Sequence, residues 1–187
     1  MTVRLRSMID PIYLTEMVEM AKATPVGCFV EVGVYRGGSA QYLYEVAESQ
    51  GRTLHLFDTF SGMPHAGELD GWRVGELMPV ADDFIAIVKA LPNAKIYQGV
   101  FPETLPIDFP QIAFVHADAD QYQSTKAICE SLYPRLVPGG IILFDDYGDE
   151  KTKGCTKAVD EFVAQLPFGC FKRSPRYRAH IQRPFSG

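Results

Sequence analysis

The sequence predicts an α/β fold: a doubly wound, mostly parallel sheet of seven strands that ends in an antiparallel strand pair. Short apolar segments alternate with amphipathic segments along the 187 residues, as strands alternate with helices in such folds. Acidic residues directly follow several of the apolar segments. There is no internal repeat, and this length is typical of one domain, covering residues 1–187.

In the first half of the chain, each element has its own local evidence. Asp10 and Pro11 predict the start of a helix that runs to about Ala23, with Asp as the N-cap and Pro at the first helical position. Its expected inner face is formed by Ile12, Leu14, Met17, Val18 and Ala21. Buried strands are expected at 29–32 and 53–58, separated by a helix that begins near Gln41.

In the second half, the same alternation continues. Asp82 and Asp83 open a helix whose inward side is expected to carry Phe84, Ile85, Ile87, Val88 and Leu91. Pro138-Gly-Gly is expected to form a turn before a strand at 141–144. The remaining predictions are strands at 95–99 and 112–118, helices at 124–133 and 156–166, and a final strand pair at 168–172 and 178–182.

The segment 61–80 shows no helical or strand period and contains the only tryptophan, Trp72. Long irregular segments that follow a strand are often functional, so a lid over a binding site is expected here. The alternative is a surface loop without a role.

A glycine-rich turn joins the strand at 29–32 to the next helix through Gly33, Gly37 and Gly38. Glycines allow a close approach of the backbone to a ligand, and the N–H groups at the start of a helix favour anions. Asp58 follows Gly38 by twenty residues at the end of the second strand, where an acid can bind the hydroxyls of a ribose. These features predict a cofactor that contains a nucleoside. The alternative is a plain tight turn with a solvated Asp58.

A second group of acids follows two later strands. Asp118 ends the strand at 112–118, and Asp145 and Asp146 follow the strand at 141–144. If these strands are neighbours, the three carboxylates repel one another unless a divalent cation such as Mg²⁺ lies between them. The alternative is that the acids cap helices and face water. His116 and His55 lie within apolar strands and are expected to be core residues.

Charge and composition restrict the partners. The formal net charge of −5 argues against nucleic acid as the main partner. The first residues lack the apolar core of a signal peptide, and no apolar run has transmembrane length, so a soluble, cytoplasmic protein is expected. The four cysteines show no zinc-binding spacing, and Cys28 and Cys129 are expected to be buried thiols.

Several segments, taken in this order, resemble the macrocin O-methyltransferase (TylF) family of class I S-adenosylmethionine (SAM) methyltransferases. The first, Glu31-Val-Gly-Val-Tyr-Arg-Gly-Gly-Ser, is similar to methyltransferase motif I, and His116-Ala-Asp-Ala-Asp-Gln-Tyr-Gln-Ser-Thr is similar to the acidic motif of the family. The other matching segments are 58–64, 98–106, 132–140 and 144–148. The resemblance implies a Rossmann-like class I methyltransferase fold.

The resemblance also implies residue roles. Glu31, Gly33 and Ser39 would hold the methionine part of SAM. Asp58 would bind the ribose, and Gly99 and Val100 would border the adenine. Asp118 is assigned to the cofactor site, to the metal and to proton transfer as a catalytic base. The implied magnesium ligands are Asp118, Asp145 and Asp146.

The expected function is therefore metal-dependent transfer of a methyl group from SAM to a hydroxyl of a sugar or small natural product. A vicinal diol fits best, because neighbouring hydroxyls can fill two free positions of a six-coordinate cation. Two alternatives are a nicotinamide-dependent oxidoreductase and a cofactor-binding module without catalysis. The glycine spacing, G-x-x-x-G-G, departs from the dinucleotide pattern G-x-G-x-x-G. A homo-oligomer is left open, and no membrane or nucleic-acid partner is expected.

Overall fold

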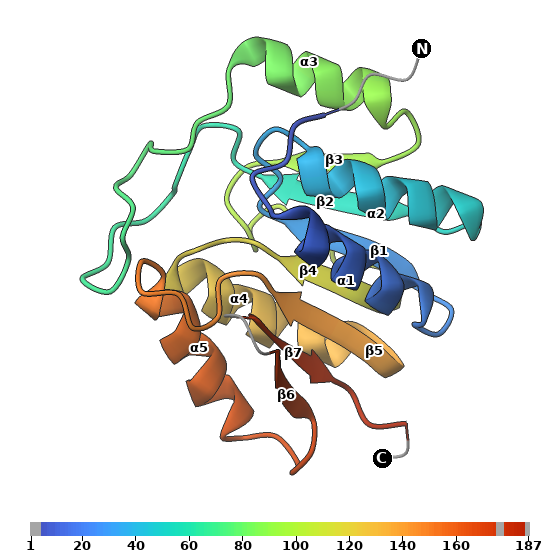
Figure 1. The fold of residues 1–187 in the computed structure, drawn as a ribbon, viewed down its shortest axis with the longest axis vertical. Helices are drawn as coiled ribbons and strands as arrows, with labels where there is room; N and C mark the ends of the chain where they lie inside the picture. Colours follow the sequence, from blue (N-terminus) through green and yellow to red (C-terminus); the bar gives the residue numbers. More distant parts are fainter. Residues whose placement is uncertain (1–4, 175–177, 186–187) are drawn as a thin grey trace.

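The computed structural model describes residues 5–174 and 178–185, and these form one seven-stranded sheet with helices on both faces (Figure 1). The first four residues, on which the signal-peptide prediction partly rests, lie outside the described residues. The strand order is β3-β2-β1-β4-β5-β7-β6. The strands are β1 (Cys28–Val32), β2 (Leu54–Asp58), β3 (Lys95–Gln98), β4 (Ile112–Ala117), β5 (Leu136–Phe144), β6 (Phe171–Ser174) and β7 (Arg178–Gln182).

Two apolar layers hold the helices to the sheet. One layer joins helices α1, α2 and α3 to one face through residues such as Leu14, Leu43 and Ile87. The other joins α4 and α5 to the opposite face through Ile128 and Val159. The helices are α1 (Pro11–Lys22), α2 (Gly38–Ser49), α3 (Ala81–Ala90), α4 (Tyr122–Leu132) and α5 (Lys153–Val163), and a 3₁₀ turn, η1 (Tyr133–Arg135), follows α4.

The predicted sheet topology is confirmed. Strands β1 to β5 pair in parallel, and β7 pairs antiparallel with both β5 and β6. Asp58 ends β2, while Asp118 and Asp145 directly follow β4 and β5. Since β4 and β5 are neighbours in the sheet, these three acids lie at one edge, as the sequence predicts.

Several predicted boundaries differ from the structure. Helix α5 begins at Lys153 and not at 156, and β6 begins at Phe171 and not at 168, because residues 168–169 form a turn in which Gly169 has a φ of +91°. Helix α2 begins at Gly38, and α4 begins at Tyr122, whose N–H is bound by the distant Asp70 carboxylate at 2.9 Å. The expected turn at Pro138-Gly-Gly lies inside β5, because Gly139 N–H donates to the Arg183 carbonyl at 2.9 Å and so prolongs the pairing beyond β7.

Helix faces are narrower than the periodicity predicts. Ile12 is 56% exposed, and on α3 Ile85 and Val88 are 49% and 47% exposed, although all three are predicted to point inward. Helix α3 packs through Ile87 and Leu91, which are almost fully buried.

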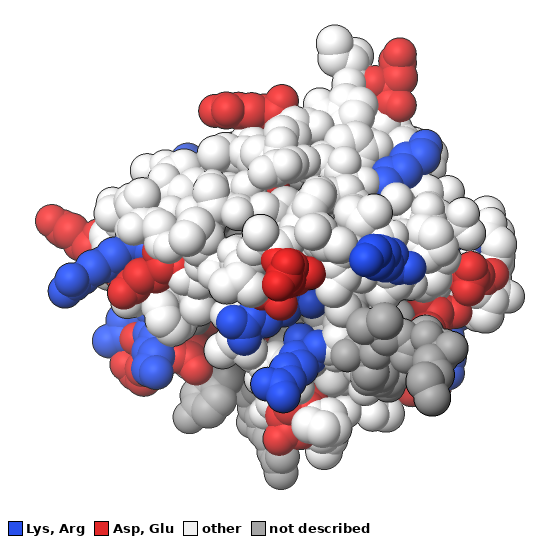
Figure 2. Space-filling view, turned by 90° about the horizontal axis from the view of Figure 1, so that it is seen from above, with Lys and Arg blue, Asp and Glu red and all other residues white. Residues whose placement is uncertain are grey.

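Three further sequence-based predictions concern the surface charges, membrane-spanning helices and two of the cysteines. Figure 2 shows acidic and basic side chains interspersed on the described part of one face, without a continuous basic surface there. Within residues 5–174 and 178–185, no helix has the length and apolar character to cross a bilayer. Cys28 and Cys129 are buried free thiols, as expected, and burial raises the pKa of each to about 12.

Candidate active site

A cavity of about 400 Å³ lies at the carboxyl edge of the parallel strands. Its lining includes residues 6–9 before α1, the glycine turn after β1, the acids after β2, β4 and β5, and part of 61–80. We call the segment 61–80 the strap. The cavity thus gathers the predicted cofactor turn and the predicted acids into one space.

Close packing within the protein requires glycine at two positions of the glycine turn. A Cβ added at Gly33, where φ is +90°, would lie 1.7 Å from the carbonyl oxygen of Asp118. At Gly38 it would lie 2.3 Å from Cα of Ser7. The absence of side chains therefore lets β1 approach the end of β4 and lets residues 6–9 close over the start of α2. No pattern within residues 6–9 indicates this role in the sequence, and only the glycines hint at it.

Asp58 is held by the glycine turn. Its Oδ2 accepts hydrogen bonds from Val34 N at 2.6 Å and Tyr35 N at 2.8 Å, and its Oδ1 accepts one from Phe60 N at 2.6 Å. A carboxylate offers about four acceptor positions, so about one remains for a ligand. Asp58 lines the cavity, and its assignment to the ribose remains a prediction. Its role in fixing the turn was not foreseen.

Glu31 lies beneath the turn and is fully buried. Its Oε1 lies 2.8 Å from Nδ1 of His116 on the neighbouring strand β4, while its Oε2 has no hydrogen-bond partner among the described residues. His116 is a core residue, as predicted, and it is also the partner of this carboxylate. Glu31 is not among the described residues that line the cavity, and its assignment to the methionine part of SAM remains a prediction.

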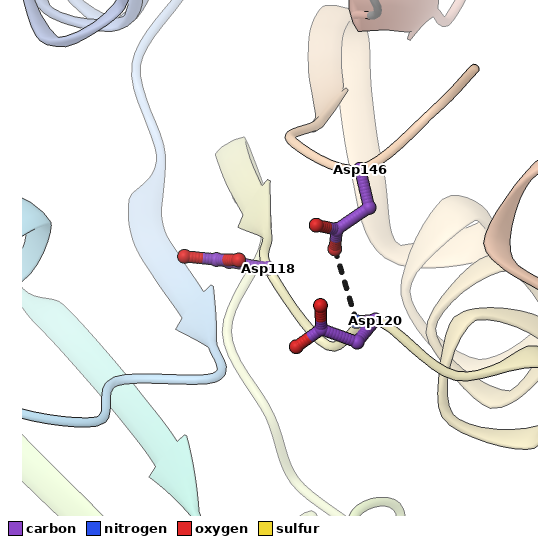
Figure 3. A group of neighbouring side chains, drawn as sticks. All are labelled: Asp118, Asp120 and Asp146. Atoms are coloured by element: carbon purple, nitrogen blue, oxygen red, sulfur yellow. Dashed lines mark hydrogen bonds between the residues drawn. The ribbon is translucent and has the colours of Figure 1, made fainter. Parts of the chain in front are cut away.

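Three carboxylates converge where β4 and β5 end. Asp118, Asp120 and Asp146 each offer an oxygen atom, and these oxygens all lie within 4.8 Å of one another (Figure 3). The backbone N–H of Asp120 donates to Oδ2 of Asp146 at 3.0 Å, the bond that Figure 3 marks. We call these three residues the acid cluster.

Burial and mutual repulsion make these acids reluctant to ionise. Burial raises the pKa of Asp118 to about 7 and that of Asp120 to about 6. The pKa of Asp146 is raised well above its ordinary value, first by burial and then by the charges of Asp120 and Asp118. A hard divalent cation with oxygen ligands would relieve this repulsion, so the acid cluster fits such an ion.

Asp145 lies beside the acid cluster and not in it. Its Oδ1 is paired with Nη2 of the buried Arg178 on β7 and lies 3.5 Å from Nε2 of His116. The structure thus brings Asp118 and Asp146 together, as the sequence predicts, but adds Asp120 where the prediction had Asp145. Asp145 still lines the cavity, and its metal-ligand role remains a prediction.

The remaining predicted cofactor residues lie around the same cavity. Ser39 and Gly99 line it. Gly99 N–H donates to the carbonyl of Asp58 at 2.9 Å, which fixes the end of β3 beside that acid. Val100 is not among the described lining residues, whereas the adjacent Phe101 is. Of the pair expected to border the adenine, Gly99 and not Val100 faces the cavity.

The strap is bound to the rest of the site at several points. Gln121 exchanges two hydrogen bonds with the backbone of His65, and Asp70 Oδ1 accepts from Tyr122 N at the start of α4. The indole N–H of Trp72 donates to Oδ1 of Asp120 at 3.0 Å. The strap therefore forms one wall of the cavity, while its opening and closing as a lid remain a prediction.

The fold identifies the class of protein. A sheet of order 3-2-1-4-5-7-6 with antiparallel final strands is the class I methyltransferase fold. The solved structure described as that of the O-methyltransferase NovP superposes with a TM-score of 0.79 at 26% identity, covering 95% of this chain and 82% of that one. Residues 12–167 match the family model described as Macrocin-O-methyltransferase (TylF), and the chain belongs to this family.

Two curated relatives are natural-product methyltransferases. The chain is 32% identical over 167 residues to 8-demethyl-8-(2,3-dimethoxy-alpha-L-rhamnosyl)-tetracenomycin-C 4'-O-methyltransferase from Streptomyces olivaceus. It is 29% identical over 158 residues to demethyldecarbamoylnovobiocin O-methyltransferase from Streptomyces niveus. The matches cover 80% and 75% of this chain but only 62% and 59% of the two relatives.

Proposed function

We propose that this protein transfers a methyl group from SAM to a hydroxyl of a sugar carried by a small natural product, with a divalent cation bound at the acid cluster. The observation that carries the proposal is the placement of the glycine turn, Asp58 and the acid cluster around one cavity. Methyl donor and acceptor oxygen must lie close together for direct transfer, and one cavity allows this.

The parts of SAM would bind to different residues around the cavity. Gly33 and Ser39 contact the methionine part, with Glu31 supporting the turn from beneath. The remaining acceptor position of Asp58 binds a ribose hydroxyl, and Gly99 borders the adenine. SAM supplies an already electrophilic methyl group, so the task of the protein is to orient and to exclude water.

For the metal, the oxygen ligands are drawn from Asp120, Asp146, Asp118 and the neighbouring Asp145. Carboxylate oxygens suit Mg²⁺, Mn²⁺ or Ca²⁺ better than zinc. A cation bound there would lower the pKa of a coordinated hydroxyl. Asp118 lies at the end of β4 between the glycine turn and the other acids, and it would accept the proton that the hydroxyl loses.

The acceptor class follows from the remaining coordination positions. A six-coordinate Mg²⁺ with three protein oxygens has about three positions left, and two adjacent hydroxyls can fill two of them. The relatives' names, a rhamnosyl-tetracenomycin methyltransferase among them, support a sugar as the carrier of that diol. A non-catalytic binding module would share the cofactor site but leave the acid cluster without a purpose.

The test combines binding and turnover. Calorimetry should show binding of S-adenosylhomocysteine but not of NAD. Mass spectrometry should then show methylation of glycosylated natural products with a free sugar diol, loss of activity with EDTA and recovery with Mg²⁺. The matched control is the same acceptor with one hydroxyl of the diol blocked. Full activity of the metal-free protein would exclude the metal role, and NAD binding tighter than S-adenosylhomocysteine would exclude the cofactor assignment.

A further inference from the structure

Trp72 connects the strap to the acid cluster. Its indole N–H donates a hydrogen bond of 3.0 Å to Oδ1 of Asp120, and its side chain lines the cavity. This is the only tryptophan of the chain. Indole offers one neutral donor and no acceptor, so it can orient a carboxylate without bringing a positive charge that would compete with a cation.

Trp72 is itself held in place through the three residues that precede it. Immediately before it, Gly71 N–H donates to the carbonyl of Lys151 at 2.9 Å, and Asp70 accepts from Tyr122 N. Nearby, Gly154 N–H donates to the carbonyl of Leu69 at 3.1 Å. The indole therefore projects from a fixed stretch of backbone, and this fixes the position of its N–H relative to Asp120.

The backbone of Asp120 is held separately from its side chain. Its backbone adopts a φ of +56°, which is unusual for a residue with a side chain, and its N–H is bound by Asp146. The backbone is thus fixed by one acid of the cluster. The bond from Trp72 engages Oδ1, and the same carboxylate offers an oxygen within 4.8 Å of those of Asp118 and Asp146.

We propose that Trp72 is a positioning residue for the metal site: its N–H fixes the Asp120 carboxylate so that the second oxygen faces the cation. The inference rests on the proposed function, because it concerns the same acid cluster. In this proposal the strap contributes a residue that orients a metal ligand, in addition to forming a wall of the cavity. Residues that hydrogen-bond to metal ligands commonly change metal affinity by about 10- to 100-fold when they are replaced.

The central test replaces Trp72→Phe, which keeps an aromatic ring and removes the N–H. Mn²⁺ affinity is measured by calorimetry and by the electron paramagnetic resonance signal of free Mn²⁺. We expect binding weaker by about 10-fold or more, with affinity for S-adenosylhomocysteine and thermal stability close to those of the wild type. In the wild type, the emission of the single tryptophan should change with Mg²⁺ and saturate together with the calorimetric signal.

Two further variants separate positioning from loop anchoring. Asp70→Ala removes a neighbouring anchor of the strap but leaves the backbone bonds of Gly71 and Gly154, so Mn²⁺ affinity should stay near the wild-type value. In the Asp120→Asn background, Trp72→Phe should cause no further loss, because the two residues act through one carboxylate.

Three outcomes would overturn the inference: unchanged Mn²⁺ affinity in Trp72→Phe, additive losses in the Trp72→Phe/Asp120→Asn double variant, or an equal loss in Asp70→Ala. Absence of Mn²⁺ binding by the wild type would instead remove both this inference and the metal part of the proposed function. Wild-type binding with an unaffected Trp72→Phe variant would remove the inference alone.

Discussion

His116 Nδ1 lies 2.8 Å from Oε1 of Glu31, and both side chains are completely shielded from solvent. The two residues lie opposite each other on the paired strands β4 and β1, directly below the cavity. The pair connects the strand that leads into the glycine turn with the strand that leads into the acid cluster.

Replacing one member of this pair should destabilise the fold. His116→Leu leaves the Glu31 carboxylate buried without its partner, and we expect the free energy of unfolding to fall by about 3–5 kcal/mol. Urea denaturation measures the change. The double variant Glu31→Leu/His116→Leu removes both polar groups and should be more stable than His116→Leu alone. A double variant as unstable as the single one would show that packing, and not the pair, dominates.

Asp58 should contribute to stability as well as to cofactor binding. Asp58→Ala removes three hydrogen bonds from backbone N–H groups. A single hydrogen bond to a charged group contributes about 1.5–3 kcal/mol. The free energy of unfolding without ligand should therefore fall by at least the value of one such bond. Affinity for S-adenosylhomocysteine should fall too.

Ser39→Ala is the control for Asp58→Ala, because Ser39 is predicted to contact the cofactor without holding the turn. It should weaken S-adenosylhomocysteine binding with a much smaller effect on unfolding. If Asp58→Ala unfolds like the wild type, the three hydrogen bonds do not stabilise the turn, and Asp58 acts on the ligand alone.

His55 should make stability depend on pH. Burial lowers its pKa from 6.5 to about 4, and the ring lies against Phe109 with Nδ1 3.1 Å from the hydroxyl of Tyr97. Between these two pKa values the unfolded chain binds a proton that the folded protein does not. The contribution of neutral His55 is therefore complete above pH 6.5 and is lost as the pH falls towards 4.

The measurement compares the wild type with His55→Gln by denaturation at several pH values. The difference in unfolding free energy between them should be constant above about pH 7.5, where the histidine is neutral in both states. As the pH falls below 6.5, the wild type should lose unfolding free energy relative to His55→Gln. A difference that does not vary with pH would mean that His55 is protonated equally in both states.

The sequence predicts the sheet well because each strand carries its own evidence. Apolar segments that end in acids locate β2 and β4 within a residue and fix the carboxyl end of β5, although β5 begins at Leu136, five residues before its predicted start. The short spacing of the last segments predicts the antiparallel pair. Helix starts are predicted less well. Helix α4 begins at Tyr122 because Asp70, from the distant strap, binds its N–H, and no local pattern contains that contact.

The candidate site is predicted in part. Asp118 and Asp146 were placed together because they follow neighbouring strands. Asp145 follows β5 as well, but the antiparallel register of β7 places Arg178 beside it, and this register is not visible in the sequence. Asp120 is present in the motif Asp118-Ala-Asp120, yet only its turn conformation brings its carboxylate close to those of Asp118 and Asp146.

Gly33 offers the sharpest test of the link between the glycine turn and the acid cluster, because Gly169 provides a matched control. Both glycines have φ close to +90°, but an added Cβ would meet the Asp118 carbonyl at Gly33 and no described atom within 4 Å at Gly169. Gly169→Ala should therefore cost only the backbone strain of about 1–2 kcal/mol. Gly33→Ala should cost more and should also weaken both S-adenosylhomocysteine and Mn²⁺ binding, because the end of β4 that carries Asp118 must move. Denaturation and calorimetry on the two variants measure these effects. Equal costs, with ligand binding intact in Gly33→Ala, would mean that the turn and the acid cluster are independent of each other.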